Sequence, residues 1–435
     1  MIAKRVLHNA KWIVLCRIAQ ALLQLIVGMI TARYLGPANY GLIGYAGSIA
    51  AFALPLMQLG LPSTLVQELI EAPEAEGRIM GTALVLDLLS GIVSIGLVCA
   101  FVSVANHGET ETLIVCALYS VSLLFRALEV MQCWFQYKLA SKYASVVMLC
   151  AYITVSAYKV FLLATAKSIH WFALANAIDS GLVGFALVCI YRRMGAQKLT
   201  FAWPMAKRLL KRSRYYILSS MMVTVFQHTD HVMLKMFSSD AENGVYTAAV
   251  TCTATCHFLY SAIVDSMRPV ILEDKKRHSP DYGKNVSGLY STTIYLALFQ
   301  GTAFTIFAEL LVRVMYGDAY LAAVPVLRII VWQVSFAYMG SVRNIWILAQ
   351  GQQQLVWRVN LCGALMNAAV NFLLIPKWGA CGAAAASLAT QIFTNFILGF
   401  IIKPLRENNR LLLAGLNPRT AAEFIHGLLR GRGAA

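Results

Sequence analysis

The chain consists of long apolar runs separated by short polar segments. Apolar runs near 20 residues have the length of a membrane-crossing helix, and we place twelve of them along the 435 residues. Six runs precede one dense basic segment and six follow it. We therefore predict an all-α integral membrane protein, with spans at about 12–33, 41–66, 79–105, 113–137, 143–166, 171–191, 215–236, 244–270, 286–312, 320–348, 355–375 and 380–402.

The basic segment between Tyr191 and Tyr216 holds eight of the 36 Lys and Arg residues. In a soluble protein such a run indicates a solvated face or a nucleic-acid patch. Here 59% of residues are hydrophobic and only 13% are charged, so we interpret the segment as a loop kept on the cytoplasmic side by the positive-inside rule. Most other basic residues fall on the same side. Twelve spans then place both termini in the cytoplasm, and we expect no nucleic-acid partner.

The basic segment also divides the chain. We predict an N-terminal six-helix lobe at 1–191, a basic cytoplasmic linker at 192–214, a C-terminal six-helix lobe at 215–403 and a cytoplasmic tail at 404–435. One face of the tail after Pro418 is apolar, which is typical of an amphipathic helix lying on the membrane. The stretch 201–210 resembles it, with Trp203 as the anchor. An ordinary tether is the alternative for both segments.

The two halves begin alike. A shift of 203 residues aligns four positions of the first hairpin with the seventh-to-eighth-span turn: Tyr34 with Phe237, Ala38 with Ala241, Gly41 with Gly244, and Ala46 with Ala249. Because each half has six spans, both halves have one orientation, and a pseudo-two-fold axis along the membrane normal should relate the lobes. Transporters built in this way place their site between the halves.

Polar residues inside the spans indicate a wet cavity. An ionisable side chain facing lipid at mid-depth costs about 3 kcal/mol. Ten of them would cost about 30 kcal/mol, which exceeds the free energy of unfolding of a typical protein, roughly 5–15 kcal/mol. Several lie on polar stripes at helical spacing. The candidate cavity residues are Arg17, Gln24, Asp87, Arg126, Glu129, Lys159, Asp179, Asp230, Lys235, Arg328 and Asn367.

Other interpretations remain open for individual residues. Arg17 and Lys159 are long enough to reach the two membrane surfaces, and Arg126 and Glu129 are spaced to pair along one helix. The Ser, Thr and Asn stripes are also typical of polar contacts between helices. The cluster at 228–231 suggests a metal site or a proton relay, with a polar patch near the outer membrane surface as the alternative. Arg343 lies near the end of a span, and we interpret it as a boundary residue.

Catalytic signals are absent from the sequence. It contains no Walker loop, no G-x-G-x-x-G after a strand, no nucleophile elbow and no H-E-x-x-H. The ten cysteines include no C-x-x-C pair. We therefore predict that the protein is not an enzyme and has no catalytic residue, metal or cofactor. Energy for transport is expected from a Na+ or H+ gradient, the membrane potential or the gradient of the substrate.

Several short motifs lie at hairpins and span ends in both halves of the chain. They are ARYLGPANYG at 32–41, TDHVMLK at 229–235, GVYTAA at 244–249, GDAY at 317–320 and NFLLIP at 371–376. The first resembles the opening, and the others resemble later segments, of Wzx-type polysaccharide flippases of the multidrug/oligosaccharidyl-lipid/polysaccharide (MOP) superfamily. These are helix-packing and turn patterns, so they indicate the family better than the substrate.

The resemblance implies a two-lobed, V-shaped transporter with alternating access. It would move undecaprenyl-pyrophosphate-linked oligosaccharide repeat units across the bacterial cytoplasmic (inner) membrane for O-antigen, capsule or exopolysaccharide assembly. Implied partners are the lipid-linked oligosaccharide, membrane lipids, a polysaccharide polymerase and a chain-length regulator. Four cations would then be candidates to contact the pyrophosphate, namely Arg17, Arg126, Lys159 and Arg328.

Three other functions compete with this one. A cation-coupled, MATE-like drug antiporter would bind cations at Asp87 or Asp230. A lipid II flippase is expected to have two further spans. A membrane polysaccharide polymerase or glycosyltransferase would require a long outside loop or a catalytic domain, and the sequence predicts neither.

Overall fold

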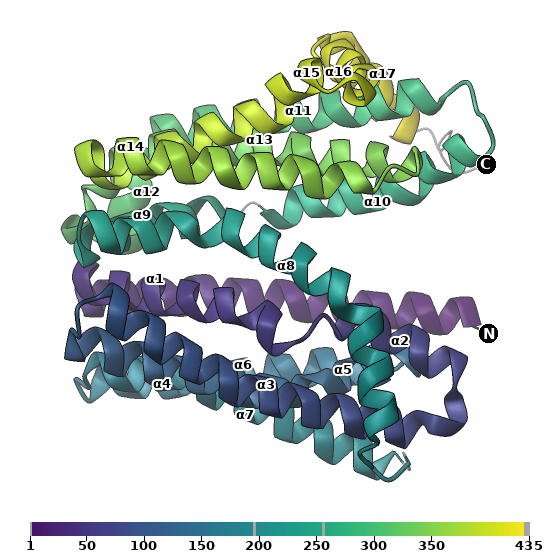
Figure 1. Cartoon of the computed structure of the whole chain (residues 1–435). Helices are drawn as coiled ribbons and strands as arrows, with labels where there is room; N and C mark the ends of the chain where they lie inside the picture. Colours follow the sequence, from purple (N-terminus) through teal and green to yellow (C-terminus); the bar gives the residue numbers. More distant parts are fainter. Residues whose placement is uncertain (1, 195–196, 255–256, 430–435) are drawn as a thin grey trace. The chain divides into compact units, whose positions relative to one another are not determined.

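The computed structural model of the 435-residue chain describes residues 2–194, 197–254 and 257–429 (Figure 1). Every regular element within these ranges is helical, which confirms the predicted all-α class. The chain folds into two compact units, Met1–Gly244 and Val245–Ala435. Each unit is a bundle of long helices and is described by itself.

Unit 1 contains all the described helices that precede α9. They are α1 (Ile2–Met57), α2 (Pro62–Glu71), η1 (Pro73–Ala75), α3 (Glu76–Ala105), α4 (Thr110–Arg126), η2 (Ala127–Val130), α5 (Met131–Tyr137), α6 (Ser141–Ala164), α7 (Ile169–Arg193) and α8 (Trp203–Phe237). The next helix, α9 (Asp240–Ala254), begins in unit 1 and continues into unit 2.

Unit 2 holds the remaining elements. They are α10 (His257–Lys276), α11 (Tyr282–Ile306), α12 (Ala308–Tyr316), η3 (Asp318–Tyr320), α13 (Ala323–Ala349), α14 (Gln354–Ile392), the π-helical turn η4 (Phe393–Ile397), α15 (Leu398–Ile401), η5 (Lys403–Leu405), α16 (Arg406–Ala414) and α17 (Pro418–Leu429).

Glycine interrupts the two longest helices. Gly36 in α1 has a φ of 72° and Gly379 in α14 a φ of 51°, in the left-handed region where other residues are strained. With 56 residues α1 is about 84 Å long, and with 39 residues α14 is about 59 Å long, against about 30 Å of bilayer core. Each helix is therefore long enough to cross twice, and both breaks fall between expected spans.

Many helices have the length and composition of membrane spans. Within the described residues seven stretches qualify, or eight when α11 and α12, bent by 71°, count as one span. Two of the seven contain the breaks at Gly36 and Gly379. The multi-pass membrane character agrees with the sequence, whereas the count of twelve spans stays a prediction.

In unit 1 the core forms along α1 and α7. The helix α1 packs against α3, α4, α6 and α8, and α7 packs against α4 and α6. One apolar cluster centres on Trp134, whose ring meets Phe135 and Tyr191 edge to face at 5.1 Å and 4.9 Å. Large apolar side chains also lie on the outside, among them Ile92 and Phe185. Such surfaces are rare on water-soluble monomers and indicate contact with lipid.

The predicted cytoplasmic linker at 192–214 lies within unit 1, whose last residue is Gly244. Residues 203–214 of that linker are helical, as the first part of α8. The boundary falls beyond α8 because α8 packs on α1, α2 and α3. The two six-helix lobes, their axis and the cytoplasmic linker and tail stay predictions.

In unit 2, α13 lies against α10, α11 and α14. Its core includes Tyr290, Trp346 and Ile347, all buried. The expected tail helix is present as α17, and Phe424 of this helix packs on Gly288 of α11, where a side chain would overlap the ring. Contact of α17 with a membrane surface stays a prediction.

Candidate functional site

Four of the sequence-predicted charges lie on neighbouring elements of unit 1. Arg126 ends α4, Glu129 lies in η2, Lys159 in α6 and Asp179 in α7. Asp179 interacts electrostatically with both Lys159 and Arg126, and Glu129 interacts with Arg126 and Asp179. The structure therefore brings these four residues into one group of two cations and two carboxylates, which we call the mixed-charge cluster.

The local backbone explains this placement. The α-helical geometry of α4 gives way at Arg126 to the 3-10 turn η2, in which residues three apart lie on one side. Arg126 and Glu129 therefore face the same way. Gly184 of α7 lies against Leu128, whose Cβ would be only 2.6 Å from an added Cβ, so glycine allows α7 to approach this turn.

Side chains around the cluster are polar and aromatic. The Nε2 of Gln132 donates to Oε2 of Glu129 at 3.1 Å. Tyr119 interacts electrostatically with Arg126, and Tyr152 with Asp179. Arg126 is exposed, while Glu129 and Asp179 are half-buried. This surrounding offers hydrogen bonds and aromatic faces near an accessible guanidinium, the combination expected for a polar, anionic ligand.

Two of the sequence-predicted aspartates in unit 1 have a buried oxygen without a hydrogen-bond partner among the described residues. Oδ1 of Asp179, and Oδ1 of Asp87 on α3, are buried without a hydrogen-bond partner within the described part of the chain. Buried polar atoms without partners are uncommon. Asp87 is 2% exposed and interacts with Cys133 of α5. Both aspartates are therefore suited to take up a proton or a cation.

The sequence-predicted residues of α8 occupy a different place. Asp230 is buried, and Nδ1 of the neighbouring His231 lies 2.8 Å from Oδ1 of Asn243. Lys235 Nζ donates to Glu109 Oε2 at 2.9 Å and to Asp240 Oδ2 at 2.7 Å. These ion pairs tie α8 to the start of α9 and to the segment before α4. A role for Asp230 and Lys235 in binding stays a prediction.

The remaining candidates are spread over both units. Arg328 of α13 is exposed, and its Nε donates to the carbonyl of Thr305 at 3.3 Å. Asn367 and Asn371 are buried on α14, with Nδ2 of Asn371 donating to Oδ1 of Asn367 at 3.0 Å. Gln24 is exposed on α1. The side chain of Arg17 lies outside the described residues.

No group of three or more His, Cys, Asp or Glu suited to a metal ion occurs in the described ranges.

Arg343, interpreted from the sequence as a boundary residue near the end of a span, is buried within unit 2. Arg343 is 5% exposed, and its Nη1 donates to the carbonyl of Thr394 at 2.7 Å and to Oδ1 of Asn395 at 2.8 Å. Both acceptors lie in the π-helical turn η4. Wide turns of this kind are often found at functional sites. The signal in the sequence was the polar run of Gln391, Thr394 and Asn395 within the last apolar stretch.

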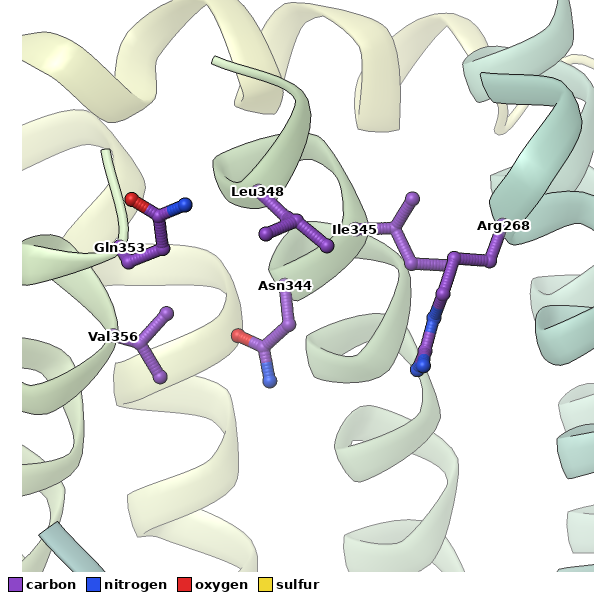
Figure 2. Close-up of a pocket in the computed structure, with 6 residues that line it drawn as sticks. All are labelled: Arg268, Asn344, Ile345, Leu348, Gln353 and Val356. Atoms are coloured by element: carbon purple, nitrogen blue, oxygen red, sulfur yellow. The ribbon is translucent and has the colours of Figure 1, made fainter. Parts of the chain in front are cut away.

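Unit 2 also contains a pocket of about 230 Å³ (Figure 2). Figure 2 shows the amides of Asn344 and Gln353 on one side and the guanidinium of Arg268 on another. Arg268 Nη2 lies 3.3 Å from Oδ1 of Asp265. None of the sequence-predicted site residues is among those lining it: Arg268, Asn344, Ile345, Leu348, Gln353 and Val356.

Long apolar helices around buried charges define this chain as a multi-pass membrane protein. The chain belongs to the polysaccharide biosynthesis protein family, whose family model matches residues 6–274. A curated relative is the probable low-salt glycan biosynthesis flippase Agl15 of Haloferax volcanii, 22% identical over 236 residues, which are 51% of this chain and 49% of the relative. The chain spans about half or less of the length of the curated relatives it matches.

Solved structures with the same fold are transporters. The lipid II flippase MurJ in an inward closed conformation aligns with a TM-score of 0.72 at 16% identity, covering 93% of this chain and 91% of that one. An inward-facing multidrug resistance MATE family transporter of the MOP superfamily aligns with a TM-score of 0.66 at 14% identity, covering 89% and 96%. The predicted MOP-type fold is confirmed.

Proposed function

We propose that the protein is a flippase that moves undecaprenyl-pyrophosphate-linked oligosaccharide repeat units across the bacterial cytoplasmic membrane by alternating access. The observation that carries this proposal is the match of residues 6–274 to the polysaccharide biosynthesis protein family. A glycan biosynthesis flippase among the relatives and a lipid II flippase among the structures of the same fold support it. The product would enter O-antigen, capsule or exopolysaccharide assembly.

The mixed-charge cluster is the proposed contact for the pyrophosphate. A guanidinium matches phosphate oxygens in a two-pronged geometry, and Arg126 is the exposed cation of the cluster. Lys159 is the second cation within electrostatic reach of Asp179. With no ligand the two carboxylates balance these charges, which limits the cost of placing them among apolar helices.

This balance provides a way to couple transport to a cation gradient. An arriving pyrophosphate adds negative charge beside Glu129 and Asp179, and like charges at short range repel. A proton or Na+ taken up at either carboxylate would remove that repulsion. The buried Oδ1 of Asp179, which has no hydrogen-bond partner in the described residues, is the favoured atom. Coupling to H+ or Na+ is therefore part of the proposal.

The sugar portion requires polar side chains rather than charges. Tyr152 beside Asp179 offers a ring face and a hydroxyl, and Gln24, Asn367 and Arg328 are the further candidates. The orientation with both termini in the cytoplasm follows from the positive-inside rule. A polysaccharide polymerase and a chain-length regulator are the proposed partners, because flipped repeat units must be joined and their number set.

A cation-coupled drug antiporter is the second candidate. The MATE-type fold and the two buried aspartates, Asp87 and Asp230, favour it. Such a protein would bind a cationic drug at a carboxylate and would not require Arg126 or Lys159.

The test is deletion of the gene in its host, followed by separate analysis of lipid-linked repeat units and drug sensitivity. We expect intact repeat units to accumulate where a membrane-impermeant oxidant cannot reach them in spheroplasts, with unchanged drug sensitivity. Reintroduction of the gene should restore export. Increased drug sensitivity with normal surface polysaccharide would instead support the antiporter.

A further inference from the structure

The first part of α8 lies across unit 1 instead of along it. In Figure 1 this part runs across the helices near one end of the bundle, before the rest of α8 turns to lie beside α1. Backbone contacts hold the preceding segment in place: Thr200 N donates to the carbonyl of Gly77 at 3.1 Å, and Ala202 N donates to Oγ1 of Thr82 at 3.1 Å. A helix that crosses the ends of membrane-spanning helices has the orientation of an interfacial helix.

Two sides of this helical segment are already occupied. One side, formed by Ala206, Leu209 and Ser213, is fully buried against the other helices of unit 1. On a flank beside them, Arg212 binds Glu71 through both Nη atoms at 2.7 Å and 3.0 Å and also pairs with the buried Glu68. Arg208 Nη2 lies 3.0 Å from Oε2 of Glu68. The nearby carboxylates are therefore engaged by these two arginines.

The third side carries cations and an aromatic ring facing outward. Trp203, Lys207, Lys211 and Arg214 are all exposed and are spaced by four, four and three residues, so they form one stripe on the helix. We call these four residues the α8 stripe. The sequence contains no Asp or Glu between residues 192 and 229. Three positive charges thus lie on this face without a carboxylate on the same helical segment.

Aromatic rings accompany the cations. Lys207 Nζ lies 5.8 Å from the ring centre of Trp203, and Arg214 Cζ lies 4.7 Å from that of Tyr215. Trp203 is 59% exposed and Tyr215 is 69% exposed. Trp and Tyr favour the headgroup level of a bilayer, and Lys and Arg extend from that level toward phosphate groups.

We propose that the α8 stripe binds the phosphate groups of anionic phospholipids at the membrane surface. The stripe extends about 16 Å along the helix, which suits a row of headgroups better than one enclosed phosphate. The charge complementarity, the exposed aromatic rings and the course across the helix ends together select a lipid surface as the occupant. Lipid binding here is separate from the proposed cargo site, which lies on α4, η2, α6 and α7.

The experiment measures lipid retained by the purified full-length protein. Wild type is placed in nanodiscs of equal phosphatidylethanolamine and phosphatidylglycerol, released into detergent, and its bound lipids are counted by native mass spectrometry. The triple variant Lys207→Ser, Lys211→Ser, Arg214→Ser should retain at least about threefold less phosphatidylglycerol. The control variant Arg192→Ser, Arg193→Ser, Lys198→Ser removes the same charge from neighbouring exposed positions and should retain the wild-type amount.

Two results would overturn the proposal. Equal retention by wild type and the stripe variant, or equal loss in the stripe and control variants, would show that the stripe has no specific role. Displacement of phosphatidylglycerol by millimolar inorganic pyrophosphate would identify a phosphate site in place of a lipid surface. A melting temperature near that of wild type is expected for the stripe variant, because these side chains face away from the buried side of α8. None of these measurements depends on transport.

Discussion

Gly41 of α1 and Gly244 of α9 pack backbone against backbone in unit 1. A Cβ on Gly41 would overlap the carbonyl oxygen of Asp240, and a Cβ on Gly244 would overlap that of Pro37. Asn243 Nδ2 donates to the carbonyl of Gly41 at 2.7 Å beside this contact. These two glycines are the pair aligned by the 203-residue shift, so the corresponding turns of the predicted repeat contact each other.

This contact predicts a stability loss on adding a single methyl group. Gly41→Ala and Gly244→Ala should each lower the melting temperature by several degrees, because overpacking costs about 1–3 kcal/mol. Gly28→Ala on α1 is the control, since no atom lies within 4 Å of its added Cβ. That variant should be neutral or slightly more stable, because alanine is favoured over glycine in a helix. Equal melting temperatures for all three variants would contradict the backbone contact.

Glu68 predicts a second stability effect. Its carboxylate is fully buried and pairs with Arg208 and Arg212, so Glu68→Gln removes a charge that both arginines face. We expect the melting temperature to fall by about 5 °C or more, because the neutral amide loses two charge-assisted contacts at a fully buried position. The control is Glu273→Gln, which removes an exposed pair with Arg277 on α10. An exposed pair contributes little, and a similar fall in both variants would contradict the prediction.

Glu109 predicts a pH dependence in the acid range. Lys235 donates to Glu109 and holds the pKa of that carboxyl below its ordinary value. A carboxyl whose pKa is lowered on folding stabilises the folded state above its unfolded-state pKa of about 4.3. This stabilisation is lost as the pH falls through the lowered pKa. Melting temperatures measured from pH 6 to pH 3 should therefore fall more steeply for wild type than for Glu109→Gln. Glu74→Gln at an exposed position should keep the wild-type slope.

Substitutions of Lys159 and Asp179 are expected to have non-additive effects on the free energy of unfolding. Each single neutralisation, Lys159→Met or Asp179→Asn, leaves an unbalanced charge within the helix bundle and should lower stability. The double variant should be more stable than the sum of the two single effects predicts, by about 1 kcal/mol or more. Unfolding in detergent measures the cycle. Strict additivity would show that the two side chains do not interact.

Substitution of Arg126 is expected to reduce transport without lowering the amount of protein in the membrane. Arg126→Gln should reduce export of lipid-linked repeat units by at least about tenfold, since a charge-assisted contact to phosphate is removed. Arg126→Lys should restore only part of it, because an ammonium lacks the two-pronged geometry. Lys167→Gln, at an exposed cation outside the cluster, is the control. Normal export by Arg126→Gln at normal membrane abundance would exclude Arg126 from the site.

The fold class was predictable because apolar length decides it. The hydropathy of the chain indicates spans near 20 residues and the short segments between them. The breaks at Gly36 and Gly379 fall between these expected spans. The boundary between compact units was not predictable in this way. It depends on the packing of α8 on α1, and on the ion pairs of Arg208 and Arg212, which no local pattern specifies.

The candidate site was predictable in membership and only partly in arrangement. Charge within an apolar run selected Arg126, Glu129, Lys159 and Asp179, but their proximity follows from how α4, α6 and α7 pack. Lys235 has the same kind of sequence signal and is instead held by Glu109 and Asp240. Distinguishing the two cases requires knowing the partners of Lys235. Glu109 lies 126 positions before it in the sequence, and Asp240 lies five positions after it.

The widened turn at 393–397 and the guanidinium of Arg343 depend on each other. A regular α-helix there would shift the carbonyl of Thr394 and the amide of Asn395, both of which accept from Arg343. Loss of the arginine would likewise remove the donor that these two groups share. Evolution should therefore keep or discard the two features together, and members of the family that lack this arginine should have a regular α-helix in place of the π-helical turn at 393–397.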